Sequence, residues 1–268
     1  MFGHGPRDPV ITIQQHLTPN YPATVQSRTV VRAMWLFAAA GLWTLLHPPV
    51  LPDIWDVLLR LPGLFGEVGL GAAIMASMRV NIEAIVLSSL IALPLAWATR
   101  IPLLAPLGRG LSQLRFLSPA SFYIVLLLVL GGGHAVKLWM LVLAQSFYLV
   151  TTMTNVVENI PAEAFDEAKV LRMTDWQAMW YIVVRGTLAD ALEAIRDNAA
   201  IGWSMLMMVE GIIRSEGGMG VLIYNMQERR MDYEAGFAIA VAIGIIGFVQ
   251  DWALREARSE LCPYTKLS

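Results

Sequence analysis

The chain has 268 residues, of which 56% are hydrophobic and only 15% are charged. Soluble domains carry about 25% charged residues, so this composition, together with apolar runs of membrane length, excludes an ordinary soluble protein and a disordered one. The 19 basic and 21 acidic residues leave no basic excess for nucleic acid, and the single cysteine, Cys262, excludes a disulfide scaffold. The composition therefore predicts an all-α, polytopic membrane protein.

Six apolar segments come close to the roughly 20 residues that a helix needs to cross a bilayer. In chain order they cover residues 30–46, 80–99, 117–130, 135–153, 188–211 and 235–252. The amphipathic, glycine-rich segment 53–77 is expected at the membrane interface. The transmembrane domain is thus predicted over 30–255, between an N-terminal tail (1–29), polar and Pro-rich unlike a cleaved signal peptide, and a C-terminal tail (256–268).

The distribution of Lys and Arg predicts the orientation of these spans, because cytoplasmic loops are enriched in both residues. With the N-terminus inside, twelve basic residues fall on the cytoplasmic side and five on the outer side. An even number of spans then places both termini in the cytoplasm.

The largest cytoplasmic loop, 154–187, combines polar residues with a helical pattern of apolar ones, among them Phe165, Leu171 and Trp176. A structured amphipathic loop between two spans favours docking onto a cytoplasmic partner. The alternative is a surface helix that lies among the lipid headgroups.

Several motifs resemble those of ABC importer permeases, most closely the nitrate, sulfonate, taurine and bicarbonate type. Ile160–Ala168, followed by Trp176 and Gln177, is similar to the cytoplasmic coupling motif of that family, which reads Glu-Ala-Ala, three residues, Gly, and later Leu-Pro. The further matches, in the family's order, are Leu130–Lys137, then Arg196, Trp203 and Glu210, then Gly218–Gly220, and finally Gly244, Gly247 and Asp251. The resemblance covers about residues 80–255.

The resemblance implies a type I ABC importer permease fold in a bacterial inner (cytoplasmic) membrane. The partners that it implies are cytoplasmic ABC ATPase subunits, an extracytoplasmic substrate-binding protein and a second permease copy or homologue. ATP and Mg²⁺ would bind to the partner ATPase, with no cofactor on this chain, which lacks a phosphate-binding loop of its own. The implied function is ATP-driven alternating access for a small solute, of which an anion such as nitrate, sulfonate or bicarbonate is typical.

The resemblance assigns the coupling role to residues of the 154–187 loop, which are Pro161, Glu163, Asp166, Glu167, Ala168, Arg172 and Trp176. Arg172 takes the position of the family's glycine, and Val184-Arg185 replaces Leu-Pro; a register one residue later puts Met173 at the glycine instead. Only glycine enters the left-handed backbone region without penalty. We therefore expect Arg172 to keep the segment more continuously helical and to alter its coupling to an ATPase.

The fifth predicted span carries charges inside an apolar stretch, and such charges normally face a bundle interior or a water-filled path. Its candidates for the translocation path are Arg196, Asp197, Trp203 and Glu210. Arg196, Trp203 and Glu210 follow one another at seven-residue spacing and so share a helix face. In the alternative interpretation, Arg196 pairs with Glu193 three residues earlier and reaches toward the membrane surface.

The sixth predicted span presents small residues at spacings that let helices approach closely, namely Gly236, Ala240, Gly244 and Gly247. No pattern in the chain predicts a metal site or an enzymatic motif. Two other functions stay open beside the permease. One is a diverged membrane scaffold that transports nothing, and the other is an ion-coupled carrier that uses Glu193 and Asp197.

Overall fold

The computed structural model describes residues 25–46 and 52–262, and these residues form helices and turns without a strand. Two compact units divide the chain, one over 1–58 and one over 59–268. The first contains α2 (Val25–Leu46), where the indole nitrogen of Trp43 donates to the carbonyl oxygen of Pro52 at 3.2 Å. Helix α3 (Ile54–Glu67) begins in the first unit and ends in the second.

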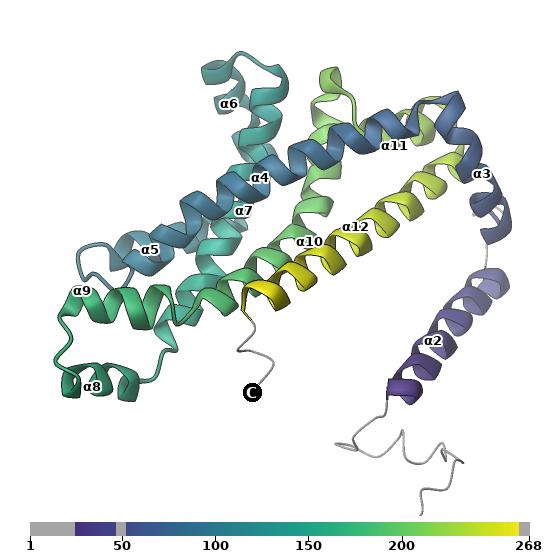
Figure 1. The fold of residues 1–268 in the computed structure, drawn as a ribbon. Helices are drawn as coiled ribbons and strands as arrows, with labels where there is room; N and C mark the ends of the chain where they lie inside the picture. Colours follow the sequence, from purple (N-terminus) through teal and green to yellow (C-terminus); the bar gives the residue numbers. More distant parts are fainter. Residues whose placement is uncertain (1–24, 47–51, 263–268) are drawn as a thin grey trace, which may run out of the picture. The chain divides into compact units, whose positions relative to one another are not determined.

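The second unit holds the remaining helices, which Figure 1 labels along the chain. They are α4 (Leu70–Ala98), α5 (Ala105–Gln113), α6 (Tyr123–Leu130), α7 (Gly133–Glu158), α8 (Ala162–Val170), α9 (Asp175–Ala178), α10 (Leu188–Ile212), α11 (Met219–Tyr224) and α12 (Tyr233–Leu261). Short turns of 3-10 helix cover Leu114–Phe116, Pro119–Phe122 and Arg214–Glu216, and π-helical turns cover Met179–Val184 and Asn225–Arg230.

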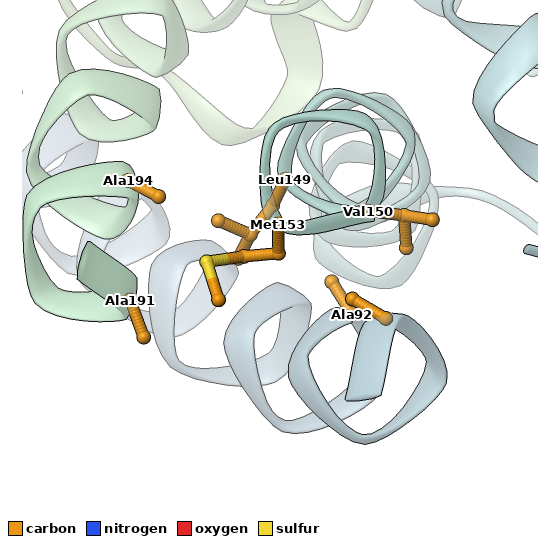
Figure 2. Close-up of a cluster of buried hydrophobic side chains, with 7 residues drawn as sticks. Ala92, Leu149, Val150, Met153, Ala191 and Ala194 are labelled. Atoms are coloured by element: carbon orange, nitrogen blue, oxygen red, sulfur yellow. The ribbon is translucent and has the colours of Figure 1, made fainter. Parts of the chain in front are cut away.

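The centre of this unit is the packing of α4, α7 and α10 against one another. Figure 2 shows one part of it, where Leu149 and Met153 of α7 fill the space between alanines of the two neighbouring helices. Lipid tails are as apolar as these side chains, so close van der Waals contact rather than transfer from water holds such helices together. The small Ala92, Ala191 and Ala194 permit that close approach.

Three described helices are long and apolar enough to cross a membrane, namely α4, α7 and α12, and a bent pair, 105–116 with 119–130, can make a fourth span. The expected all-helical, polytopic architecture is therefore confirmed, although the six expected spans are not reached by these criteria. Helix α10 has 25 residues but more than two charges within every 18-residue window, and α2 is represented by the shorter apolar stretch Thr29–Leu45.

Two helices extend beyond the spans that were predicted for them. Helix α4 starts at Leu70 rather than near residue 80, so the segment expected at the interface ends with the first turns of a span. Ser77 and Asn81 interrupt the apolar pattern there, but both are buried against neighbouring helices. Helix α12 continues to Leu261, so the described part of the predicted C-terminal tail is helical.

The third predicted span, 117–130, is not one straight helix. The chain bends by 106° between the helical residues 105–116 and 119–130. Pro119 causes this break because its ring lacks an N–H and forces the preceding residue out of the α region. Ser118 is accordingly extended, and its hydroxyl accepts a bond from the backbone N–H of Ala120.

Candidate functional site: the 154–187 segment and the polar interior of the bundle

Helix α8 is anchored to the ends of α4 and α7. Pro161 precedes its first turn, and Ala168 is its one fully buried residue. The guanidinium of Arg100, just after α4, lies 4.9 Å from the centroid of the Phe165 ring and donates to the carbonyl oxygen of Val157 at 2.6 Å. One face of α8 is thereby fixed against the bundle.

The opposite face of α8 is exposed and carries both acidic and large apolar side chains. A surface hollow of about 560 Å³ is lined by Glu163, Asp166, Glu167, Val170 and Leu171. Val170 is 82% exposed and Trp176, on α9, is 74% exposed. Exposed apolar groups beside acidic ones are typical of a docking surface. Lys169 donates to Asp166 at 2.8 Å, and this hydrogen bond raises the pKa of Lys169.

The expectation that Arg172 keeps the segment helical was wrong. Helix α8 ends at Val170, and Arg172 adopts a left-handed conformation with φ of 55°. The N–H of Arg172 donates to the carbonyl oxygen of Lys169 at 2.9 Å, and that of Met173 to Ala168 at 3.0 Å. This is the bonding pattern of a Schellman cap, which usually places glycine at the left-handed position. The turn between two short helices is therefore formed with an arginine.

The second short helix of the segment has its own start signal. Thr174 and Gln177 form a capping box, in which the threonine hydroxyl accepts from the Gln177 N–H and the glutamine side chain accepts from the Thr174 N–H. The N–H of Arg185 donates to the carbonyl oxygen of Trp180 at 2.9 Å, a bond that the proline of the Leu-Pro motif lacks.

Arg196 lies in a network of ion pairs that joins α10 to α12. Its guanidinium contacts Glu193 at 2.7 Å and Asp251 at 2.5 Å. Glu193 also pairs with Arg258, and Asp251 with Arg255. The pairing of Arg196 with Glu193 that the sequence allowed as an alternative is thus present, and Asp251 is a partner that the spacing along α10 could not reveal.

Trp203 lies in a buried polar layer near the middle of the bundle. Its indole nitrogen donates to the side-chain oxygen of Gln250 at 3.0 Å, and Asn81 donates to the same oxygen. A Cβ added to Gly202 would lie 2.5 Å from the side-chain nitrogen of Gln145, so a larger residue there would displace this side chain. No local pattern indicates that these amides, from three different helices, meet in one layer.

Asp197 faces away from the packed side of α10. It is exposed, as are Asp190 and Ser204, which lie seven residues before and after it on the same face. Its carboxylate forms no ion pair with any residue in the described ranges. This exposed face of α10, which also carries the apolar Ile201 and Met208, is therefore adjacent to the predicted stripe of Arg196, Trp203 and Glu210, which packs inward.

Glu210 is completely buried and pairs with Lys137 of α7 at 2.8 Å. Lys137 lies near the start of the fourth predicted span, and its pairing with Glu210 was not predicted from the sequence. A lysine one turn into an apolar helix was the available signal, because such a side chain needs a partner when buried.

The four small residues of the sixth predicted span do not share one environment in α12. Gly236 is buried against Gln227, and Gly247 lies beside Trp203, whereas Ala240 and Gly244 are exposed. Their joint role in helix packing stays a prediction. Among the described residues, no group of three or more His, Cys, Asp and Glu side chains could hold a metal ion.

Comparison with known proteins adds a family. Residues 69–255 match the model of the family described as binding-protein-dependent transport system inner membrane component. The chain is 24% identical to the taurine transport system permease protein TauC of Escherichia coli (strain K12), over 82% of each chain. It is 26% identical to a probable ABC transporter permease protein of Brucella melitensis biotype 1, over 79% of this chain and 86% of the relative.

Two solved structures share the fold. One is the MetNI methionine ABC transporter in an inward-facing conformation, with a TM-score of 0.57 and 13% identity over 71% of this chain and 95% of that one. The other is an amino acid ABC transporter with histidines, with a TM-score of 0.59 and 15% identity over 75% of this chain and 96% of that one. At these identities the likeness concerns the arrangement of the helices alone.

Proposed function

The chain belongs to the family of binding-protein-dependent transport system inner membrane components, and we propose that, as an ABC importer permease subunit, it carries a small polar solute across the membrane by ATP-driven alternating access. The observation that carries this proposal is the retained helix–turn–helix of α8 and α9, with its exposed acidic and apolar face. A permease that lacks its own ATP site needs such a surface so that ATP hydrolysis on a partner subunit can change its conformation.

The solute that we propose is a small anion or an anion-bearing molecule of the sulfonate class. The similarity to the taurine permease supports this class, as does the subgroup that the sequence motifs resemble. Both termini are proposed to lie in the cytoplasm of the cell, on the side of α8, on the strength of the Lys and Arg distribution.

The ATPase docks, in this proposal, on α8 and α9. Glu163, Asp166 and Glu167 supply negative charge, while Val170 and Trp176 supply apolar contacts at the edge of the bundle. The left-handed turn at Arg172 sets the angle between the two helices. A second permease subunit and an extracytoplasmic binding protein complete the importer.

The passage for the solute runs, we propose, along the exposed polar face of α10. A carboxylate at membrane depth costs at least about 2.5 kcal/mol if it faces lipid, so Asp197 requires water or a polar partner outside this chain. Ser204 lies on the same face, further along the helix. Arg196, Trp203 and Glu210 then shape the passage from behind, through the contacts that hold α10 in place.

Purification of the tagged chain from its native membrane in a gentle detergent tests the function. We expect a stoichiometric ATPase with a phosphate-binding loop to co-purify, and the reconstituted complex to take up solute only with ATP. A clean permease without an ATPase, or uptake that proceeds without one, would contradict the proposal. The solute can then be identified from the binding protein that stimulates ATP hydrolysis.

Cysteine labelling tests the passage, because Cys262 is the only native cysteine and can be replaced by serine. In that background, Ser204→Cys should react with a membrane-impermeant, charged thiosulfonate reagent, since water-exposed thiols ionise and lipid-facing ones do not. Phe248→Cys, on the apolar face of α12 and 80% exposed in this chain, is the matched control and should react much more slowly. Equal rates would remove the α10 face from the passage.

A further inference from the structure

Three helices meet at a buried cluster of charged and hydroxyl groups at the end of the bundle where α7 begins and α10 ends. We call it the Lys137 cluster: Ser77 of α4, Lys137 of α7, Glu210 of α10 and the backbone of residues 217–220. Lys137 is 1% exposed, and Ser77 and Glu210 are 0% exposed. The coupling segment does not use these groups, and in the proposed passage Glu210 acts only from behind, through its hold on α10.

The polar side-chain atoms of the cluster have partners within it. The Lys137 ammonium lies 2.8 Å from Glu210 Oε1 and donates to the carbonyl oxygen of Gly217 at 2.9 Å. The Ser77 hydroxyl donates to the Glu210 carboxylate at 2.8 Å and accepts from the N–H of Met219 at 2.9 Å. The N–H of Gly220 donates to Glu210 Oε2 at 2.8 Å. One carboxylate thus binds two side chains and the backbone of a loop.

The loop is shaped to receive this carboxylate. A Cβ at Gly218, where φ is 121°, would lie 2.2 Å from Glu210 Oε1, and a Cβ at Gly220 would lie 2.5 Å from the carbonyl oxygen of Met207. Any larger residue at either position would push the loop away from α10. Gly218 and Gly220 therefore leave room for the Glu210 carboxylate in addition to allowing the turn.

Separating these elements would expose or orphan a buried charge, which is far more costly than sliding one apolar helix face along another. We propose that the Lys137 cluster locks α4, α7, α10 and the start of α11 at this end into one rigid body, which keeps its internal contacts throughout the transport cycle. Lys137 and Glu210 are then positioning residues, and alternating access occurs at the surfaces of this body rather than within it.

This inference rests on the proposed function, since it concerns a cycle driven by ATP. Its consequence is specific: the gate at this end of the passage lies between the rigid body and another element or subunit. By contrast, the mid-depth amides Asn81 and Gln145 each keep a buried atom without a hydrogen-bond partner in the described residues. The bundle is therefore less tightly bonded at its middle than at this end.

A reversible cross-link tests the proposal in the reconstituted complex with its ATPase. Ser77→Cys and Met219→Cys are combined in the Cys262→Ser background, because the Ser77 hydroxyl already touches the backbone of Met219. We expect the oxidised pair to retain at least about half of the uptake and ATP hydrolysis of the reduced pair. A tenfold loss upon oxidation, restored by reductant, would overturn the proposal. Each single-cysteine variant serves as the control for oxidation itself.

Hydrogen exchange provides a second measurement on the unmodified complex. The amide protons of Met219 and Gly220 should be equally protected in the nucleotide-free and the ATP-trapped states, whereas a tenfold faster exchange in either state would show that the cluster opens. Failure of the proposed function looks different. In that case the reduced cysteine pair and the unmodified protein would both lack ATP-dependent uptake, while the protection of these amides would still report on the rigidity of the cluster.

Discussion

Arg172, just after the end of α8, has a left-handed backbone conformation that suits glycine better than a residue with a Cβ. The Cβ of an L-residue in this region comes too close to the neighbouring carbonyl oxygen, which costs about 1–2 kcal/mol. Arg172 accepts this cost because two backbone hydrogen bonds, from Arg172 and Met173, close the helix end. Its exposed side chain also meets no steric barrier in water.

Replacement of Arg172 by glycine should therefore stabilise the protein by about 1 kcal/mol, because the left-handed strain disappears while the more flexible unfolded chain offsets part of the gain. The measurement is thermal unfolding in detergent. Arg172→Val, which places a β-branched residue at the same φ, should lower the melting temperature. A melting temperature that falls with glycine would mean that the arginine side chain itself stabilises the turn.

In the Lys137 cluster, removing either Lys137 or Glu210 leaves the other buried without its partner. Lys137→Met or Glu210→Gln should each destabilise the protein by about 3–5 kcal/mol, since an uncompensated charge or donor stays buried. The double variant should recover much of that loss, and folded yield together with the melting temperature would measure it. Glu216→Gln, in the same loop but exposed, should change little. Additive losses in the double variant would argue against a coupled pair.

Among the elements, α8 offers an amphipathic surface outside the bundle. Its buried side, with Ala168 and Phe165, fixes it to the ends of α4 and α7, while its exposed side carries three carboxylates. Such an element can transmit a displacement because it is short, closed by backbone hydrogen bonds at its C-terminal end and attached to two helices at once.

Charge reversal on this face should weaken the association with the ATPase. Glu167→Lys places a cation where the exposed surface is acidic, and we expect roughly tenfold weaker binding, equivalent to about 1.4 kcal/mol, with the fold intact. Binding of the ATPase to detergent-solubilised permease measures the effect. Glu260→Lys, at the exposed end of α12, is the matched control. Unchanged binding by the Glu167 variant would exclude α8 from the docking surface.

How far the sequence predicts these elements depends on whether local pattern or distant contact decides them. The apolar runs predicted a helical membrane protein, and the capping pattern of Thr174 and Gln177 lies in the chain itself. The start of α4 was misplaced because Ser77 and Asn81 look like interface residues until helices far along the chain bury them. The partners of Arg196 and Glu210, Asp251 and Lys137, lie 55 and 73 residues away along the chain, beyond any helical period.

For the molecule as a whole, the network around Arg196 ties α12 to the rest of the bundle. Few residues of α12 are buried, so the ion pairs from Glu193 and Arg196 to Asp251 and Arg258 form a large part of its attachment at this end. Arg196 is the member of this network that contacts carboxylates on both helices.

Arg196→Ala should therefore reduce folded yield, uptake and ATPase binding together, because Glu193 and Asp251 then lose the cation that joins α10 to α12 through both of them. Arg196→Lys should retain more of all three, though less than the wild type, since lysine cannot contact both carboxylates in the same planar arrangement. Parallel assays on membranes measure the three quantities. A loss of uptake alone, with yield and ATPase binding intact, would instead assign Arg196 to the solute.

The bend at Pro119 shortens the apolar length that this part of the chain presents to the surrounding lipid. The two arms, 105–116 and 119–130, have 12 residues each and so reach only about 18 Å, well short of the roughly 30 Å hydrocarbon core of a bilayer. We expect acyl chains next to this corner to shorten or splay, whereas those beside α7 and α12 need not. The importer is therefore expected to work best in thin membranes, and uptake in vesicles of increasing acyl-chain length should decline as the mismatch at this one corner grows.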